Sequence, residues 1–271
     1  MDERASFGDH SGMELRVRTL SEEPALRERF RDFHRQAWPR FLWEGDGTGG
    51  LFPRIYTDFA EFQFGIWNEP GSLVAVGNTI PFICDGSTAD LPPDIKETLE
   101  RGLAVKQEGR KPTALSALAA IVDPAQRARG LSQKVIEAMG ELARGHGLKT
   151  LVAPVRPSLK QLYPLTPMER YITWTRPDGT HFDPWLRVHQ RMGAEILRVA
   201  PKCMVITDTV ARWEEWTGLR FPESGTYAVP GAFQPVKIDV RRNTGHYEEA
   251  NVWMRHPLTL PSPPRGRGKT T

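Results

Sequence analysis

The sequence predicts a single α/β (α+β) domain in which helices pack against one central sheet. The first observation is a nearly continuous run of small and apolar residues at 113–122, typical of a strand buried on both faces. The second is the strand–helix–strand order that begins with this run and extends to residue 155. The third is that no break in composition divides the chain, whose hydrophobic (39%) and charged (25%) fractions are ordinary globular values. We expect one domain over 13–256, preceded by a flexible arm at 1–12 and followed by a disordered basic tail at 257–271.

The N-terminal part contributes strands and helices to this prediction. Residues 13–20 alternate apolar and polar side chains, the period of a half-buried strand. Residues 24–41 place apolar side chains at three- and four-residue intervals and predict an amphipathic helix. Residues 51–67 carry a similar aromatic and aliphatic spacing, so they predict a second helix, and 72–82 predict a strand. Residues 85–111 are polar and predict irregular connections with one short helix.

The central part gives the clearest local architecture. The buried strand at 113–122 is followed by an apolar helical stripe over 131–143, which Gly145 and Gly147 close. Residues 150–155 then predict the next strand. This order is that of a βαβ-type unit, with its helix packed across the sheet.

The C-terminal part is less regular. The chain is rich in proline and tryptophan from residue 157 to about residue 184. The elements predicted after it are a helix, two strands, a short helix and at least one more strand, at 185–192, 194–199, 204–208, 211–218 and 227–240.

Composition excludes several classes of protein. The net charge of +3 is matched by the three basic residues of 257–271, so the rest of the chain has no basic field of the size that nucleic acid needs. Cys84 and Cys203 lie far apart without CxxC or CxxH neighbours, which excludes a disulfide scaffold or zinc knuckle and predicts no metal. No stretch approaches the ~18 apolar residues of a membrane span, and the start is polar. We therefore expect a cytoplasmic protein with no nucleic-acid or membrane partner.

Two glycine-rich matches are accidental. Residues 45–50 satisfy GxGxxG but follow a helical segment, whereas the dinucleotide fingerprint needs a strand before it and a helix after it. Gly268-Lys269-Thr270 is followed by only one residue, so it lacks the helix N-terminus on which a P-loop holds phosphate.

The turn between the buried strand and the apolar helix predicts an anion site. The first N–H groups of a helix lack internal partners and lie at the positive end of its dipole. Gly130 permits close approach of the backbone, Ser132 can cap, and Arg127 and Arg129 add positive charge. Together these groups suit a pyrophosphate. The alternative is an ordinary capped helix with two solvated arginines.

This turn resembles a family motif. Arg127-x-x-Gly130-x-Ser132 is similar to the R/Q-x-x-G-x-G/A acyl-CoA motif of the GNAT (Gcn5-related N-acetyltransferase) superfamily, with serine where glycine or alanine is usual. The resemblance implies a mixed, mostly antiparallel sheet flanked by helices, with two splayed strands that admit pantetheine, and a C-terminal extension. It implies coenzyme A contacts from Ile121, Val122, Gln126, Arg127, Ala128, Arg129, Gly130, Leu131 and Ser132.

A second anchor lies downstream. The segment 185–194 resembles the Y-x-x-x-G-F helix-to-strand segment of the superfamily, whose tyrosine often protonates the leaving thiolate. Counting four residues back from Gly193 gives His189, which the resemblance makes the general acid. A histidine suits this role because its ordinary pKa of about 6.5 lies near working pH. The alternative is a packed or solvated helical histidine.

A narrower resemblance suggests a different chemistry. Residues 153–164, 168–179 and 182–194 look like the GNAT-like loading domains of certain polyketide synthases. Those domains decarboxylate a malonyl thioester, with a histidine and a hydroxyl residue implicated. His189 is the matching histidine, and Ser158 is a candidate for the hydroxyl.

Further residues are candidates for the substrate pocket. Trp38 or Trp43 is a candidate wall of an acyl pocket, although core packing is the commoner role of a tryptophan. Lys202 or Arg198 is a candidate partner for a carboxylate, and each of them could equally belong to the scaffold. Glu248-Glu249 reads as solvated charge, so no carboxylate stands out as a base for an amine.

Three functions therefore remain open. The first is transfer of an acyl group from acetyl-CoA or another acyl-CoA to an amine. The second is decarboxylation of a malonyl thioester of coenzyme A or of an acyl carrier protein. The third is a non-catalytic acyl-CoA-binding module. The expected partner is a small-molecule or carrier-protein thioester.

Overall fold

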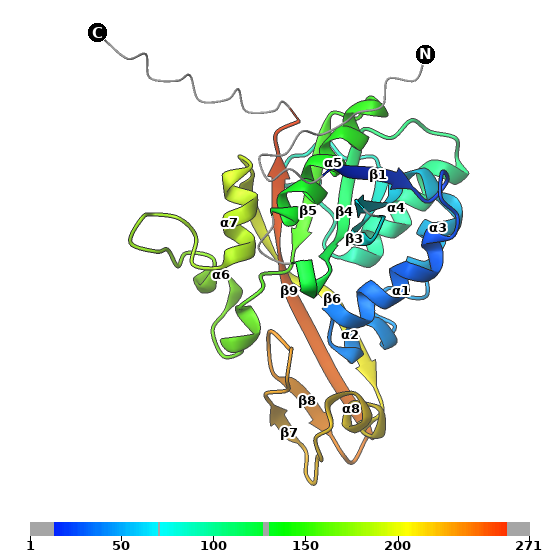
Figure 1. The fold of residues 1–271 in the computed structure, drawn as a ribbon. Coiled ribbons are helices and arrows are strands. Elements are labelled where there is room, and N and C mark those ends of the chain that lie inside the picture. Colours follow the sequence, from blue (N-terminus) through cyan, green and yellow to red (C-terminus); the bar gives the residue numbers. More distant parts are fainter. Residues whose placement is uncertain (1–13, 70, 127–129, 259–271) are drawn as a thin grey trace, which may run out of the picture.

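The computed structural model describes residues 14–69, 71–126 and 130–258, and these form one nine-stranded sheet with helices on both faces (Figure 1). The strand order is β1-β2-β3-β4-β5-β9-β8-β7, with β6 also paired to β9. Of these pairs, β4–β5 is parallel and the others are antiparallel, so the expected mixed, mostly antiparallel sheet is confirmed. The predicted arm and all but two residues of the predicted tail lie outside the described residues.

The N-terminal part differs from its prediction at two places. Its elements are β1 (Leu15–Thr19), α1 (Leu26–Ala37), α2 (Arg40–Glu44), η1 (Phe52–Arg54), α3 (Ile55–Asp58), η2 (Ala60–Phe62), β2 (Gln63–Asn68) and β3 (Leu73–Phe82). The helix predicted over 24–41 divides at Trp38, which is extended because a residue before proline disfavours the α region. The helix predicted over 51–67 is wrong beyond Asp58. Residues 63–68 form a strand instead, since β1 and β3 satisfy their peptide groups from both sides.

The central part matches its prediction closely. Its elements are α4 (Ile95–Gln107), β4 (Ala114–Val122), η3 (Pro124–Gln126), α5 (Leu131–Gly145) and β5 (Thr150–Val155). The helix expected within 85–111 is longer than predicted, at 13 residues, and Asp94 caps it by accepting a hydrogen bond from the Glu97 N–H.

The C-terminal part differs from its prediction at β6 and β9. Its elements are η4 (Lys160–Leu162), α6 (Met168–Tyr171), α7 (Pro184–Arg191), β6 (Glu195–Asp208), α8 (Val210–Thr217), β7 (Gly225–Tyr227), β8 (Val236–Asp239) and β9 (Thr244–His256). The two strands predicted at 194–199 and 204–208 are one strand, β6, with an irregularity between Ala200 and Met204 that accommodates Pro201. The unpredicted strand β9 joins β5, β6 and β8.

The central sheet forks between β4 and β5. These strands pair only over Ala114–Ser116 and Thr150–Val152. Beyond this point β4 remains on β3 as far as Val122, while β5 follows β9 as far as Val155. The splayed strands implied by the motif at 127–132 are therefore present.

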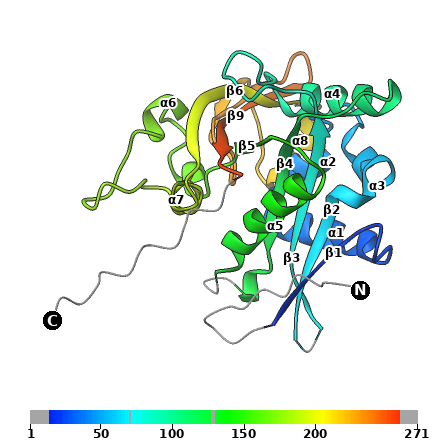
Figure 2. The same ribbon diagram turned by 90° about the horizontal axis from the view of Figure 1, so that it is seen from above.

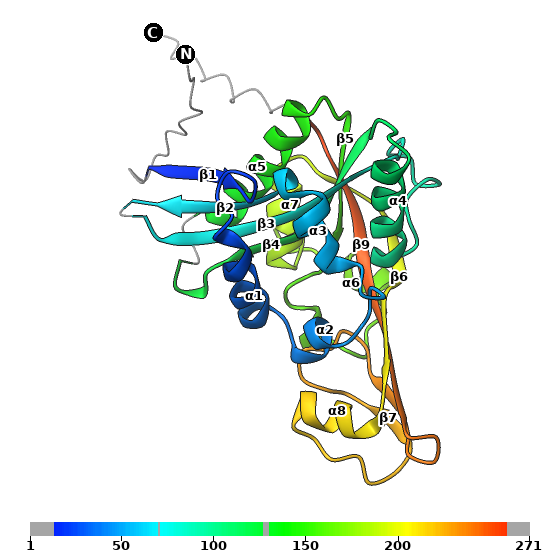
Figure 3. The ribbon, with the colours of Figure 1, turned by 90° about the vertical axis from the view of Figure 1, so that its right-hand side faces the viewer.

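The two sides of the fork carry different helices. Helix α1 packs Phe30 and Phe33 in one cluster with Ala119 and Ile121 of β4. Figure 2 and Figure 3 show α5 and α7 on the other side of the sheet. Among the described residues, no helix combines the length and apolar character needed to cross a membrane.

Candidate functional site

A cleft of about 1700 Å³ lies at the fork. Its wall includes residues 117–122 of β4 and 153–155 of β5, the stretches that have separated from each other. Residues of α5 and α7 line it from one face of the sheet, and residues of α1 and α2 line it from the other. The volume exceeds that of an ordinary small-molecule pocket. The cleft therefore has room for two reactants that approach from opposite sides.

The cleft edge of β4 offers backbone groups to a ligand. Residues 117–122 pair with β3 on one side, and their register with β5 ends at Ser116. Ala117, Ala119 and Ala120 have small side chains, so a ligand can approach their backbone closely. Peptide groups on such an edge can bind an extended ligand as a strand would.

The predicted anion turn lies at the start of α5. Gly130 precedes the helix with a positive φ of 75°, a backbone conformation that favours glycine. Ser132 is half-buried and lines the cleft, as do Ile121 and Val122. Arg127, Ala128 and Arg129 lie outside the described residues.

Two other residues of the predicted coenzyme A loop have specific environments. The Leu131 side chain is buried in the main core, so only its backbone remains for a ligand. The Gln126 side-chain oxygen is buried and has no hydrogen-bond partner among residues that the structure describes. A buried amide oxygen without a partner is rare in a native protein.

His189 belongs to a buried histidine pair on the wall of the cleft. Its Nδ1 lies 2.8 Å from Nε2 of His256, the last residue of β9. Its Nε2 is buried and has no hydrogen-bond partner within the described part of the chain. Burial, and secondarily the charge of His256, holds the pKa of His189 well below its usual value, and burial lowers the pKa of His256 to about 4. Both rings are therefore neutral near pH 7.

A buried carboxylate, Asp183, connects Ser158 to the helix that carries His189. Asp183 caps α7 by accepting hydrogen bonds from the Trp185 N–H and the Leu186 N–H, at 2.8 and 3.2 Å. It also accepts from the Ser158 N–H (3.2 Å), the Leu159 N–H (2.7 Å) and the Tyr171 hydroxyl (2.8 Å). Ser158 is exposed and lines the cleft. Asp183 before Pro184 is a helix-start signal that could have been found in the sequence.

The two candidate tryptophans also line the cleft, on its α1 side. The Trp38 ring stacks on His34 with centroids 4.5 Å apart, and the Arg35 guanidinium lies 4.9 Å from the centroid of the Trp43 ring. The ammonium of Lys202, by contrast, pairs with Glu248 at 2.8 Å and does not line the cleft. Arg198 donates to the carbonyls of residues 91 and 92. Neither cation joins the other predicted site residues.

The prediction that Glu248 and Glu249 are both solvated is wrong for Glu249. Successive side chains of β9 point to opposite faces of the sheet, so one glutamate turns inward. Glu249 is 1% exposed and lines the cleft. Arg156 donates to its two oxygens at 2.9 and 3.0 Å, and the Tyr247 hydroxyl donates at 2.7 Å.

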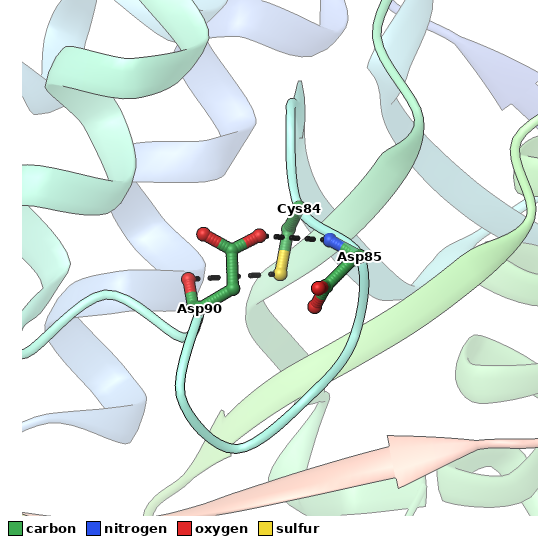
Figure 4. Close-up of side chains that lie close together, drawn as sticks. All are labelled: Cys84, Asp85 and Asp90. Atoms are coloured by element: carbon green, nitrogen blue, oxygen red, sulfur yellow. Dashed lines mark hydrogen bonds between the residues drawn. The ribbon is translucent and has the colours of Figure 1, made fainter.

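A cysteine-and-aspartate group lies outside the cleft, in the loop after β3 (Figure 4). The ligand atoms of Cys84, Asp85 and Asp90 all lie within 4.8 Å of one another. The Cys84 thiol accepts from the Gly86 N–H, and the Asp90 carboxylate accepts from the Asp85 N–H at 2.8 Å. Burial raises the pKa of the Cys84 thiol to about 11, so it stays protonated at neutral pH. These contacts close the loop.

Comparison with known proteins places the chain among acyl-CoA enzymes. It is 34% identical over 250 residues to arginine N-acetyltransferase avaD of Aspergillus versicolor, a match that covers 82% of this chain and 85% of that protein. No protein-family model matches the chain.

Two solved structures share the fold. The loading GNATL domain of CurA from Lyngbya majuscula matches with a TM-score of 0.57 and 17% identity, over 91% of this chain and 98% of that chain. The GphF GNAT-like decarboxylase, solved with isobutyryl-CoA, matches with a TM-score of 0.56 and 18% identity, over 90% and 100% of the two chains. At such identities the likeness establishes the architecture and not the reaction.

Proposed function

Because the chain belongs to the GNAT superfamily and is an acyl-CoA-dependent N-acetyltransferase of that type, we propose that it acetylates arginine. The observation that carries this proposal is the 34% identity to an arginine N-acetyltransferase over 85% of that protein's length. The forked sheet supports it, since the cleft between β4 and β5 is open to both faces of the sheet.

In this proposal acetyl-CoA binds at the α5 and α7 side of the fork. Its pyrophosphate accepts from backbone N–H groups within residues 127–132, at the positive end of the α5 dipole, because the Gln126 N–H already donates to the Asp123 carbonyl at 2.8 Å. The pantetheine arm follows the unpaired edge of residues 117–122. The acetyl carbonyl accepts from a β4 N–H, which stabilises the oxyanion of the tetrahedral intermediate.

Arginine binds at the α1 side. Glu28, Asp32 and Asp46 are exposed carboxylates on that part of the wall and suit the guanidinium. Arg27 and Arg31 lie one helical turn apart on α1 and also line the cleft, where they suit the carboxylate of the amino acid. The carboxylates and arginines of this wall therefore match the guanidinium and the carboxylate of arginine in charge.

His189 faces the leaving sulfur in this proposal. Its ring is neutral and too weak an acid to give up a proton, so its Nε2–H donates a hydrogen bond that stabilises the departing thiolate, and solvent supplies the proton. The amine nitrogen forms a bond to the thioester carbon, the carbon–sulfur bond breaks, and the thiolate takes a proton. When His256 Nε2–H donates to His189 Nδ1, the neutral His189 ring carries its hydrogen on Nε2, the atom that lacks a partner. This arrangement makes His189 the hydrogen-bond donor and His256 the positioning residue behind it.

Acetylation of arginine is tested with the purified full chain. We expect thiol release from acetyl-CoA to require arginine, and mass spectrometry to detect acetylarginine. Lysine and agmatine serve as comparison amines, because each lacks one of the groups assigned a partner above. Binding of acetyl-CoA without arginine-dependent release of thiol would contradict the proposed acceptor.

One observation favours a second reaction, decarboxylation of a malonyl thioester. Ser158 and His189, the hydroxyl and the imidazole that the loading-domain resemblance implies, line the same cleft. Release of carbon dioxide from malonyl-CoA without release of free thiol, in the absence of any amine, would support this reaction.

A further inference from the structure

We propose that His34 is the base that removes the proton from the acceptor amine, at the opposite side of the fork from His189. The proposal rests on the proposed acetylation and assigns the group that accepts the amine proton. His34 lies on α1, is 9% exposed and lines the cleft.

A hydrogen bond to a residue of β3 places His34 beside the point where β4 and β5 separate. His34 Nε2 lies 2.8 Å from the Asn78 side-chain oxygen. Asn78 is on β3, opposite Ala119 of β4. Ala119 comes three residues after Ser116, the last residue of β4 that pairs with β5. His34 therefore faces the stretch where the strands have separated, from the α1 side, whereas α7 carries His189 on the other side (Figure 2).

A chain of hydrogen bonds fixes which nitrogen of His34 carries hydrogen. The Gln63 amide nitrogen donates to the carbonyls of Phe59 (2.9 Å) and Thr79 (2.8 Å), which fixes the orientation of that side chain. Its oxygen accepts from the Asn78 amide nitrogen at 3.1 Å and from the Thr79 N–H at 3.2 Å. The Asn78 oxygen consequently faces His34, and an amide oxygen only accepts. The neutral His34 ring must therefore bear hydrogen on Nε2 and a lone pair on Nδ1.

The surroundings keep this ring neutral and fixed. Burial lowers the pKa of His34 to about 4, with the Asn78 hydrogen bond opposing the effect, so the lone pair on Nδ1 is available at neutral pH. Trp38 stacks on the ring at an interplanar angle of 18°, and Phe52 meets it edge-on with centroids 5.7 Å apart. A fixed ring is the condition for efficient proton transfer to a bound substrate.

Three other titratable groups on the wall of the cleft are less suited to be the base. Burial raises the pKa of the Tyr56 hydroxyl far above its usual value, so it stays protonated. The Glu249 carboxylate already accepts from Arg156 and Tyr247. Asp46 accepts from the Gly50 N–H at 2.6 Å.

The proposed step balances in atoms and protons. The neutral amine adds to the thioester carbon, which makes its nitrogen cationic and strongly acidic. The proton then leaves that nitrogen for His34 Nδ1, and the pair of electrons left on nitrogen helps expel the thiolate. The Asn78 oxygen stabilises the imidazolium through Nε2–H, and the proton returns to solvent after product leaves.

The test is His34→Gln, whose amide can still donate to Asn78 but cannot act as the base. His146→Gln, at an exposed histidine outside the cleft, is the matched control. With arginine as acceptor we expect kcat of His34→Gln to fall by about 10²-fold or more, with the Kd for acetyl-CoA unchanged. A folded His34→Gln enzyme with kcat within about threefold of the control would overturn the assignment.

A measurement on the unaltered protein covers the case in which His34→Gln does not fold. Nitrogen-15 NMR of the histidine side chains, with the Asn78 contact used to assign the signal, reports which ring nitrogen bears hydrogen. We expect hydrogen on Nε2 at pH 7, and hydrogen on Nδ1 would overturn the proposal. If the unaltered protein binds acetyl-CoA but does not acetylate arginine, the proposed acceptor fails, whereas loss of activity confined to His34→Gln supports the base.

Discussion

Replacement of Asp183 by asparagine tests how the structure holds Ser158 and His189 together. Asparagine has nearly the same volume, so the change leaves no cavity and isolates the hydrogen bonds. One oxygen of Asp183 accepts from the Leu159 N–H and the Tyr171 hydroxyl, and the other accepts from the N–H groups of Ser158, Trp185 and Leu186. Asparagine has only one oxygen, so in either orientation its NH₂ group faces donors.

The expected cost follows from these contacts. A buried donor left without an acceptor costs about 1–3 kcal/mol, and the remaining bonds lose the strength that a charged acceptor gives. We expect the free energy of unfolding to fall by about 2–4 kcal/mol. In a chain of this size, 1 kcal/mol shifts the melting temperature by about 2–4 °C, so the expected shift is about 5–15 °C.

The assay is calorimetric and chemical unfolding of Asp183→Asn beside Asp178→Asn. Asp178 is an exposed aspartate of the same connection and accepts from Thr180, so it controls for the loss of a surface charge. We also expect kcat to fall in Asp183→Asn, because the helix that carries His189 loses its cap. A melting temperature within about 2 °C of the control would refute the reasoning.

Three further predictions concern the cleft. His189→Ala should lower kcat by about 10²-fold or more, measured with saturating acetyl-CoA, while calorimetry gives an unchanged Kd; an unchanged rate would remove His189 from the mechanism. Arg156→Met should lower the free energy of unfolding in urea by about 3–5 kcal/mol, because it leaves the Glu249 carboxylate buried without its cation, and a loss below about 1 kcal/mol would contradict that pairing. The free energy of unfolding should fall as the pH decreases from about 6.5 to 4. The cause is that His34, His189 and His256 have lowered pKa values when folded, so the unfolded chain binds more protons in this range. His256→Gln should flatten the dependence in pH-dependent denaturation curves.

The parts of the fold that sequence predicted are those set by local pattern. The strand–helix–strand unit over 113–155 has a buried strand, a single apolar stripe and helix-closing glycines, and each of these signals lies within its own element. Strand β2 was missed because its strand state depends on hydrogen bonds to β1 and β3, which a local window does not contain. Strand β9 was missed because its acidic pair reads as solvated surface.

In the candidate site, too, the sequence indicates residues that lie in local patterns and does not indicate the partners that folding brings to them. His189 follows from the helix-to-strand motif, Ser158 is a candidate suggested by the loading-domain resemblance, and both line the cleft. The partner of His189 is His256, 67 residues away along the chain, and no spacing rule links them. The sequence does not indicate His34, because its proposed role depends on hydrogen bonds with Asn78 and, through it, Gln63. The amide orientation of Gln63 is set by backbone carbonyls that only folding brings close.

A structure of the protein with acetyl-CoA bound tests most directly the central claim, which is that the fork between β4 and β5 receives the thioester. We predict the pyrophosphate on N–H groups within 127–132, the pantetheine arm along 117–122, and the sulfur beside His189. Acetyl-CoA bound away from the fork, or calorimetry that finds no binding, would contradict it.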